Sequence, residues 1–316
     1  MKIFSTTDTI SEVFPTPVLT MGNFDGVHFG HQAIFRMVKA RAQQLGGTAI
    51  VLTFDPHPQK ILFPDKEFAL LNQLEEKIDI IQAIGIDVLI CVAFTREFAA
   101  QNPKDFVRDF LVQTLRMREI YIGYNNRFGQ KQQGTPESLS RWGEEFGFRV
   151  TIVPPIIRNG VPVSSTKIRQ LLRQGLVEEA AHLLNRQYAI DGKVVPGTQR
   201  GSTLLGVPTA NIDVHHELIP KKGVYICRAV WEQRALPAVV NIGTNPTFQH
   251  EDRMTVEVHI LDFDKNLYGQ QIKVIFLKRL RDEILFAHPQ ALVQQIQADI
   301  QTATAYFRDH ASSCSV

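Results

Sequence analysis

The sequence predicts an α/β protein in two parts: an N-terminal parallel sheet with crossover helices, and a small C-terminal antiparallel β-barrel or sandwich with a terminal helix. Three observations support this prediction. The 316 residues are enough for two cores, since a single domain usually holds ~100–200 residues. In the first half, apolar strand-like runs alternate with amphipathic helical runs. After residues 185–188, short alternating strands broken by Gly and Pro take over.

The composition excludes several classes of protein. A net charge of +2, from 34 basic and 32 acidic residues, gives no basic surface for a nucleic-acid backbone, so we expect no nucleic-acid partner. Cys91, Cys227 and Cys314 are far apart, which argues against a disulfide framework and against a zinc site. The first residues lack the apolar core of a signal peptide, and no apolar run approaches the ~20 residues of a membrane span. We therefore expect a cytoplasmic protein without a membrane partner.

The N-terminal part repeats a strand, a loop and a helix. The segment PVLTMGNF (17–24) has the continuous apolar run of a buried strand. Residues 31–45 carry apolar side chains at helical spacing and end at Gly46 and Gly47. In open sheets of this kind, ligands bind beyond the carboxyl ends of the strands, where the loop after 17–24 begins. Further strands are predicted at 48–54, 87–94, 119–124 and 149–155, and helices at 74–84, 103–116 and 136–146.

Residues 164–185 contain two short helical patterns, and we place the domain boundary after them, which gives domains 1–186 and 187–316. Five strand-like runs follow, and the tail from Pro289 to Phe307 has apolar residues at helical spacing. We expect this terminal helix to cover one end or side of the second sheet. The five runs are GKVV (192–195), VYICRAVW (224–231), LPAVVNIG (236–243), MTVEVHIL (254–261) and IKVIFLKRL (272–280), and the apolar helix positions are Leu292, Ile296, Ile300 and Phe307.

The stretch MGNFDGVHFGH (21–31) predicts an anion site. Glycines and a helix start follow the first strand, where unpaired backbone N–H groups and the helix dipole favour negative charge. His28 and His31 flank this site, and Gly30 lets the chain approach closely. An imidazole suits a phosphate that gains charge during a reaction, because it donates hydrogen bonds and becomes cationic beside an anion near neutral pH. The two histidines could also be helix caps without a chemical role.

The stretch VSSTKIR (163–169) predicts a second anion-attracting helix start. Its hydroxyl residues are of the type that caps helices, and Lys167 and Arg169 add positive charge to the same end. Taken with the histidine stretch, this segment suggests a clamp for a triphosphate, although a plain helix start has the same composition.

Together, GNFDGVHFGH and VSSTKIR resemble the two signatures of the nucleotidyltransferase superfamily, HxGH and SSTxIR. The longer form GxFDGxHxGH resembles that of bacterial bifunctional riboflavin kinase/FAD synthetases. The resemblance implies a Rossmann-like nucleotidyltransferase domain in which His28, His31 and Arg169 are catalytic. The ATP site that it implies contains Gly22, Asn23, Phe24, Asp25, Gly30, Ser164, Ser165 and Thr166.

Two further stretches match the same family. The resemblance implies that His57 in TFDPHP (53–58) and Asn125 in IGYNNRFGQKQQG (122–134) contact FMN. Asn126 departs from the family, in which an aromatic residue is usual. The implied reaction is attack of an FMN phosphate oxygen on the α-phosphorus of ATP, which expels pyrophosphate while Mg²⁺ bridges the phosphates. The sequence has no activated Cys or Ser constellation for a covalent intermediate.

The stretch GTQRGSTLLGVPTANI (197–212) predicts a second phosphate site, since the chain has no Walker motif and no dinucleotide-binding fingerprint. Gly197, Gly201 and Gly206 allow backbone amides to turn toward an anion. Thr209 and Asn211 offer the hard oxygen atoms that Mg²⁺ prefers, although both could also be ordinary turn residues.

This stretch, NIGTNPTF (241–248) and VEVHILDFDKNLYG (256–269) resemble the riboflavin kinase module, and the match covers residues 188–286. The resemblance implies that Glu257 is the general base for the riboflavin 5′-hydroxyl. Strand alternation turns Glu257 away from Val256 and Val258, although an isolated Glu there could also be a solvated surface residue. The segment STLL, which begins at Ser202, lacks the glycine or basic residue often found there. The implied ATP and riboflavin site contains Gly197, Arg200, Gly201, Pro208, Thr209 and Asn211, with Thr209 and Asn211 as Mg²⁺ ligands.

The resemblance therefore implies a bifunctional enzyme of FAD biosynthesis. Its C-terminal domain would phosphorylate riboflavin to FMN, and its N-terminal domain would adenylylate FMN to FAD, both with ATP and Mg²⁺. Two alternatives stay open: a single-activity adenylyltransferase with a flavin-sensing barrel, and a flavin-binding regulator that catalyses nothing. The sequence leaves the oligomeric state open.

Overall fold

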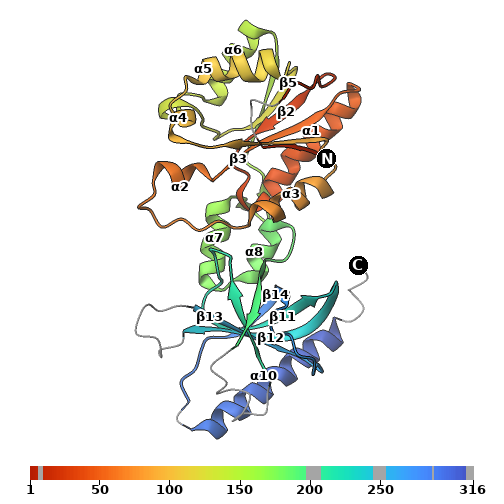
Figure 1. Ribbon diagram of the computed structural model, residues 1–316, viewed down its shortest axis with the longest axis vertical. Helices are drawn as coiled ribbons and strands as arrows, with labels where there is room; N and C mark the ends of the chain where they lie inside the picture. Colours follow the sequence, from red (N-terminus) through yellow and green to blue (C-terminus); the bar gives the residue numbers. More distant parts are fainter. Residues whose placement is uncertain (6–9, 197–207, 245–253, 287, 311–316) are drawn as a thin grey trace. The chain divides into compact units, whose positions relative to one another are not determined.

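Residues 1–5, 10–196, 208–244, 254–286 and 288–310 are described by a computed structural model (Figure 1). They form two units, Met1–Ser165 and Thr166–Val316. Buried apolar side chains cluster separately within each unit, so each has its own core, as the length of the chain predicts.

The first unit is built on six parallel strands in the order β1-β4-β3-β2-β5-β6, which confirms the predicted parallel sheet. From β2 the chain moves outward through β3 and β4, and later returns to β5 on the other side of β2. The direction of winding thus reverses between β2 and β5, and ligands bind at the carboxyl ends of strands beside such a switch point. The strands are β1 (Lys2–Phe4), β2 (Val18–Met21), β3 (Ala49–Asp55), β4 (Val88–Ala93), β5 (Glu119–Gly123) and β6 (Arg149–Val153).

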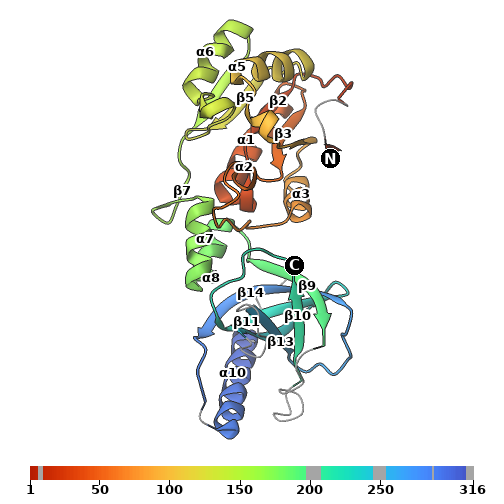
Figure 2. The same cartoon turned by 60° about the vertical axis from the view of Figure 1, so that its left-hand side comes forward.

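Helices cover both faces of this sheet (Figures 1 and 2). Helices α1 and α3 pack with Val18 and Val51 on one face. Helix α6 and the π-helix η2 pack with Leu19 and Leu52 on the other face. Neighbouring strand residues point to opposite faces, which explains why β2 and β3 are buried on both sides and mostly apolar. The helices are α1 (Phe29–Gln44), α2 (Pro58–Leu62), α3 (Leu74–Ala83), α4 (Arg96–Ala99), α5 (Pro103–Asp105), η2 (Phe106–Thr114) and α6 (Pro136–Phe146).

The predicted helix over 103–116 is present but has a geometry that the sequence does not reveal. It begins as the single turn α5 and continues as η2, where the Leu115 N–H donates to the Phe110 carbonyl five residues back. Phe106 and Leu111 are buried on its inner side. The wider spacing of a π-helix changes the backbone bonds and leaves the apolar pattern readable as a helix.

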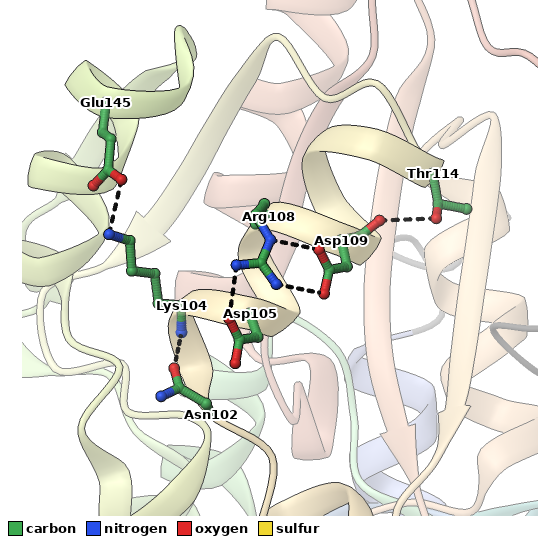
Figure 3. A network of polar contacts seen from close by, with 7 residues as sticks. All are labelled: Asn102, Lys104, Asp105, Arg108, Asp109, Thr114 and Glu145. Carbon is green, nitrogen blue, oxygen red and sulfur yellow. Dashed lines mark hydrogen bonds and ion pairs between the residues drawn. The ribbon is translucent and has the colours of Figure 1, made fainter.

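Ion pairs line the outer side of this segment (Figure 3). Lys104 of α5 lies 2.8 Å from the Glu145 carboxylate of α6. Arg108 is 2.9 Å from Asp105 and 2.6 Å from Asp109. All of these side chains are exposed, and exposed ion pairs add little stability, so the buried apolar residues Phe106, Val107 and Leu111 hold the segment on the sheet.

The second unit contains the helices α7, α8 and α10 and a closed antiparallel barrel, so the barrel alternative is correct and the sandwich is not. The strand order is β10-β13-β12-β11-β14-β9. Strand β10 is not among the five strand-like runs of the sequence, because its five residues are too few for a clear alternation. The elements are α7 (Ser165–Gln174), α8 (Val177–Leu184), β9 (Ala189–Val195), β10 (Ala210–Val214), β11 (Gly223–Trp231), β12 (Arg234–Thr244), β13 (Met254–Ile260), β14 (Gln271–Arg281) and α10 (Pro289–Asp309).

Helix α10 covers one side of the barrel, where its Ala303 packs in a cluster with Val224 of β11 and Val239 of β12 (Figure 2). Asp299 on the same face is buried and pairs with Arg281 of β14, at 2.6 Å. The centre of the buried face is thus an alanine and an ion pair, whereas the predicted apolar positions Leu292, Ile296 and Ile300 are only partly buried.

Candidate active sites

The loop between β2 and α1 carries the histidine stretch. It contains one 3₁₀ turn over Asp25–Val27, and Phe24, Gly26 and Val27 have positive φ angles of 48°, 78° and 37°. A side chain at position 26 would meet Leu71, since a Cβ there would lie 2.6 Å from Leu71 Cδ1. Glycine is therefore required at position 26 by both backbone and space.

His28 and His31 lie together at the start of α1. Their rings stack with centroids 3.5 Å apart and planes 20° from parallel. His28 is the N-cap residue of α1, and its Nδ1 accepts a hydrogen bond from the His31 N–H at 3.3 Å. The capping role considered for these histidines is therefore real for His28. The ring of His31 makes no capping hydrogen bond.

The electrostatics of His31 distinguish it from a surface histidine. Its Nδ1 is buried and has no hydrogen-bond partner among the described residues. Burial lowers the pKa of His31 well below its usual value, and His28 and Lys77 lower it further. A bound anion favours the protonated form of a neighbouring imidazole, so His31 would gain a proton most readily when an anion binds at this helix N-terminus. This behaviour fits a phosphate site.

The second motif meets the first through Ser165. Its Oγ donates a 2.9 Å hydrogen bond to the Asp25 carbonyl, across 140 positions of sequence. Helix α7 begins at Ser165, as its cap-type residues predict. Arg169 is buried on α7 in the second unit, and Thr166 also belongs to that unit.

The two residues expected to contact FMN follow strands β3 and β5. His57 is buried, accepts a 3.1 Å hydrogen bond from the Gln59 N–H at its Nδ1, and stacks on Phe68. Asn125 is exposed just beyond β5. The carboxyl ends of parallel strands share one edge of the sheet, so His57 and Asn125 lie at the same edge as the histidine loop. Asn126, the residue that departs from the family, donates from Nδ2 to the Met21 carbonyl at the end of β2, at 2.8 Å.

Sequence reasoning missed two residues that hold the histidine loop. Lys77 is buried on α3 and donates from Nζ to the Asn23 carbonyl at 3.0 Å. Asn72, also buried, accepts from the Gly26 N–H at 2.7 Å. A lysine on the inward face of the predicted helix 74–84 is the signal that could have identified Lys77, because lysine is almost never buried without a partner.

A row of polar residues crosses three strands of the barrel. Asn211 of β10 and Asn241 of β12 are the register partners of Glu257 on β13, one on each side. The neighbours of Glu257 along β13, Val256 and Val258, are buried on the opposite side, as strand alternation predicts. Burial raises the pKa of the Glu257 carboxyl, and the carboxylate of Glu283 raises it further.

The start of β10 is tied to the strand that carries Glu257. His259 Nδ1 lies 2.8 Å from the Pro208 carbonyl. A carbonyl oxygen only accepts, so this nitrogen carries the proton. Thr209 follows directly and is partly buried. Gly197, Arg200, Gly201, Ser202 and Gly206 lie outside the described residues.

Other kinds of site are absent from the described part of the chain. No group of three or more His, Cys, Asp or Glu residues there could hold a metal ion. Cys91 and Cys227 are buried free thiols, and burial raises the pKa of both. No described helix has the length and apolar character needed to cross a membrane.

Comparisons with known proteins divide the chain in the same order. A family model described as FAD synthetase matches residues 11–167, and one described as riboflavin kinase matches residues 184–307. The bifunctional riboflavin kinase/FMN adenylyltransferase of Escherichia coli (strain K12) is 38% identical over 291 residues, which are 92% of each chain. The protein of the same name from Listeria monocytogenes is 36% identical over 304 residues, 96% of this chain and 95% of the relative.

One solved structure resembles the whole fold. A crystal structure described as a macrolide-efflux protein from Streptococcus pneumoniae superposes with a TM-score of 0.86 at 30% identity. The superposition covers 96% of this chain and 98% of that one. The likeness thus extends over both the parallel sheet and the barrel.

Proposed function

The chain belongs to the family of bifunctional riboflavin kinases/FMN adenylyltransferases, and from this premise we propose which of its residues carry out the two reactions. The protein phosphorylates riboflavin to FMN and adenylylates FMN to FAD, with ATP as co-substrate. The adenylyltransferase is N-terminal and the kinase is C-terminal. We propose domains 1–186 and 187–316, and a cytoplasmic enzyme that acts on small molecules without a nucleic-acid or membrane partner.

For FAD formation, a phosphate oxygen of FMN attacks the α-phosphorus of ATP, and the bond to pyrophosphate breaks. His28 and His31 donate hydrogen bonds to the α-phosphate as its charge grows, together with the amides at the start of α1. Arg169 adds positive charge at the same α-phosphate, and Ser164, Ser165 and Thr166 bind the other phosphates. The observation that carries this proposal is the stacked histidine pair at a helix N-terminus, with a buried His31 nitrogen that has no partner among the described residues.

We assign FMN contacts to His57 and Asn125 and ATP contacts to Gly22–Asp25 and Gly30. Support comes from the parallel sheet, because these residues follow strands whose carboxyl ends share one edge. The direction in which successive strands are added reverses beside β2, and ligands usually bind at the carboxyl ends of the strands at such a point.

For FMN formation, Glu257 accepts the proton of the riboflavin 5′-hydroxyl as its oxygen attacks the γ-phosphorus of ATP, and ADP leaves. A carboxylate with a raised pKa is a better base at neutral pH than an ordinary one. The neighbouring amide of Asn211 supports the same site from β10. Gly197, Arg200, Gly201 and Pro208 complete the proposed ATP and riboflavin site.

The residues beside Glu257 suit Mg²⁺. Thr209 and Asn211 provide hydroxyl and amide oxygens, the hard donors that this ion prefers, next to a carboxylate on the neighbouring strand. Bound Mg²⁺ would neutralise charge on the phosphates of ATP. Thr209 and Asn211 would hold the ion, while Glu257 would remain available to accept the proton.

Incubation of the full chain with riboflavin, ATP and Mg²⁺, followed by chromatography of the flavins, tests the function. We expect FMN to appear first and FAD to follow. Conversion of supplied FMN without phosphorylation of riboflavin would instead support a single adenylyltransferase with a flavin-sensing barrel. Tight flavin binding without consumption of ATP would support a flavin-binding regulator.

A further inference from the structure

The loop that carries His28 and His31 has an unfavourable backbone. Phe24 and Val27 have positive φ angles of 48° and 37°, a region that side chains disfavour, and Val27 is β-branched. Backbone strain of this kind persists only where the surrounding structure enforces it. Contacts from outside the loop must therefore hold it in place.

The segment 71–77 supplies those contacts. The Lys77 ammonium donates to the Asn23 carbonyl, which also accepts from Thr53 Oγ1 at 3.1 Å. The Asn72 side chain accepts from the Gly26 N–H. In return, Asp25 Oδ1 accepts from the Leu71 N–H at 3.0 Å. Asn23, Asp25 and Gly26 of the loop are thus held by hydrogen bonds from one segment that lies more than 40 positions further along the chain.

We propose that Asn72 and Lys77 are positioning residues for FAD synthesis, which hold the strained loop so that His28 and His31 meet the α-phosphate of ATP. The inference rests on the roles proposed above for the two histidines. Neither Asn72 nor Lys77 belongs to the motifs that carry the family resemblance. Both act through the loop and do not touch the reacting atoms.

A charged residue at position 77 does more than hold a carbonyl. Burying an ammonium group is unfavourable, and an uncharged donor would serve the Asn23 carbonyl equally well. Burial lowers the pKa of Lys77, and Asp25 opposes this effect. The positive charge also lowers the pKa of His31, alongside His28. Lys77 thus adds positive potential where phosphate binds and keeps His31 neutral until then.

The test compares Lys77→Met, Asn72→Ala and the control Lys39→Met in the full chain. Lys39 is a lysine of the same unit that pairs with Asp87 just before β4, at the opposite edge of the sheet. We expect kcat for FMN adenylylation to fall roughly 10- to 100-fold in both test variants, because small displacements of catalytic groups have effects of this size. The KM for ATP should change little in Asn72→Ala, which keeps the charge of Lys77. Riboflavin phosphorylation and the Lys39→Met control should keep the parent rates.

Retention of the parent kcat for adenylylation in both test variants would overturn the proposal. Circular dichroism shows whether a variant is folded, since the first unit has its own core and riboflavin kinase activity reports only on the second. If Lys77→Met or Asn72→Ala has misfolded, Asn72→Asp decides the question. This substitution keeps an acceptor oxygen for the Gly26 N–H. A higher kcat in Asn72→Asp than in Asn72→Ala supports the positioning role, and an equal fall of kcat in the two variants contradicts it.

The role of the charge has its own readout. Lys77→Gln keeps a donor for the Asn23 carbonyl but removes the charge, so the pKa of His31, followed by NMR, should rise. An unchanged His31 pKa would overturn the electrostatic part. His31→Ala separates this inference from the proposed function. If His31→Ala loses FAD synthesis while Lys77→Met and Asn72→Ala keep the parent rate, the inference is refuted and the proposed function stands. If His31→Ala keeps full activity, the assigned site itself is refuted.

Discussion

Ser165 donates a 2.9 Å hydrogen bond to the carbonyl of Asp25 and so joins the two signature motifs of the N-terminal unit. The bond fixes Ser165, the last residue of the first unit, against the loop that carries His28 and His31. The bond thus joins residues that lie 140 positions apart in the sequence.

Removal of this hydroxyl should weaken FAD synthesis modestly. We expect Ser165→Ala to lower kcat/KM for ATP by roughly 3- to 10-fold, the value of one ordinary hydrogen bond. Ser140→Ala is the matched control, since Ser140 bonds the Pro136 carbonyl within α6. Equal kinetics of Ser165→Ala and Ser140→Ala would show that the contact has no part in ATP binding.

His31→Ala should stop FAD formation and leave FMN formation intact. Loss of one preorganised donor to a developing charge costs about 100- to 1,000-fold in kcat. Steady-state assays of both reactions on the same preparation measure this. A fall in riboflavin phosphorylation, with an unchanged circular dichroism spectrum, would contradict the assignment of His31 to the adenylyltransferase alone.

Glu257→Gln should have the converse effect. Without the carboxylate, riboflavin phosphorylation should fall by roughly 100- to 10,000-fold, the usual contribution of a general base. FAD formation from supplied FMN should stay at the parent rate. Wild-type phosphorylation by this variant would show that another group accepts the proton.

The pH dependence of riboflavin phosphorylation should reflect the two carboxylates of the barrel. Burial, and then Glu283, raise the pKa of Glu257, and a base must be deprotonated to act. Glu283→Gln removes a negative charge and lowers that pKa, so the acid limb of the kcat profile should move to lower pH. Glu232→Gln, in the exposed turn at the other end of β12, should leave the limb in place. A shift to higher pH in Glu283→Gln would contradict the argument.

Much of the fold can be predicted from local pattern. The runs of β2 and β3 are mostly apolar because helices cover both sheet faces, and the alternation around Val256 follows from a barrel with one buried face. Strand β10 and the π-geometry of η2 escape prediction, since five residues give little periodicity and a π-helix keeps a helical apolar pattern.

The site is predicted where its residues are adjacent in sequence and missed where they are not. His28, His31 and Ser165 belong to short motifs with a chemical signature. Asn72 and Lys77 reach the loop only through the return of the chain along α3, and no local pattern specifies this tertiary contact. The ion pair of Asp299 and Arg281 could not be predicted from the apolar pattern of α10 either, because Arg281 reaches the helix only through the tertiary fold.

The two reactions are assigned here to separate sites in one chain. A mixture of His31→Ala and Glu257→Gln, supplied with riboflavin, ATP and Mg²⁺, tests this assignment most directly by chromatography of the flavins. Each variant alone should make FAD from riboflavin at least about 100-fold more slowly than the parent. The mixture should make FAD much faster than either variant alone, because FMN released by His31→Ala is the substrate of Glu257→Gln. A mixture of folded variants that is no faster than either variant alone, or FAD formation at the parent rate by one of them, would contradict this assignment.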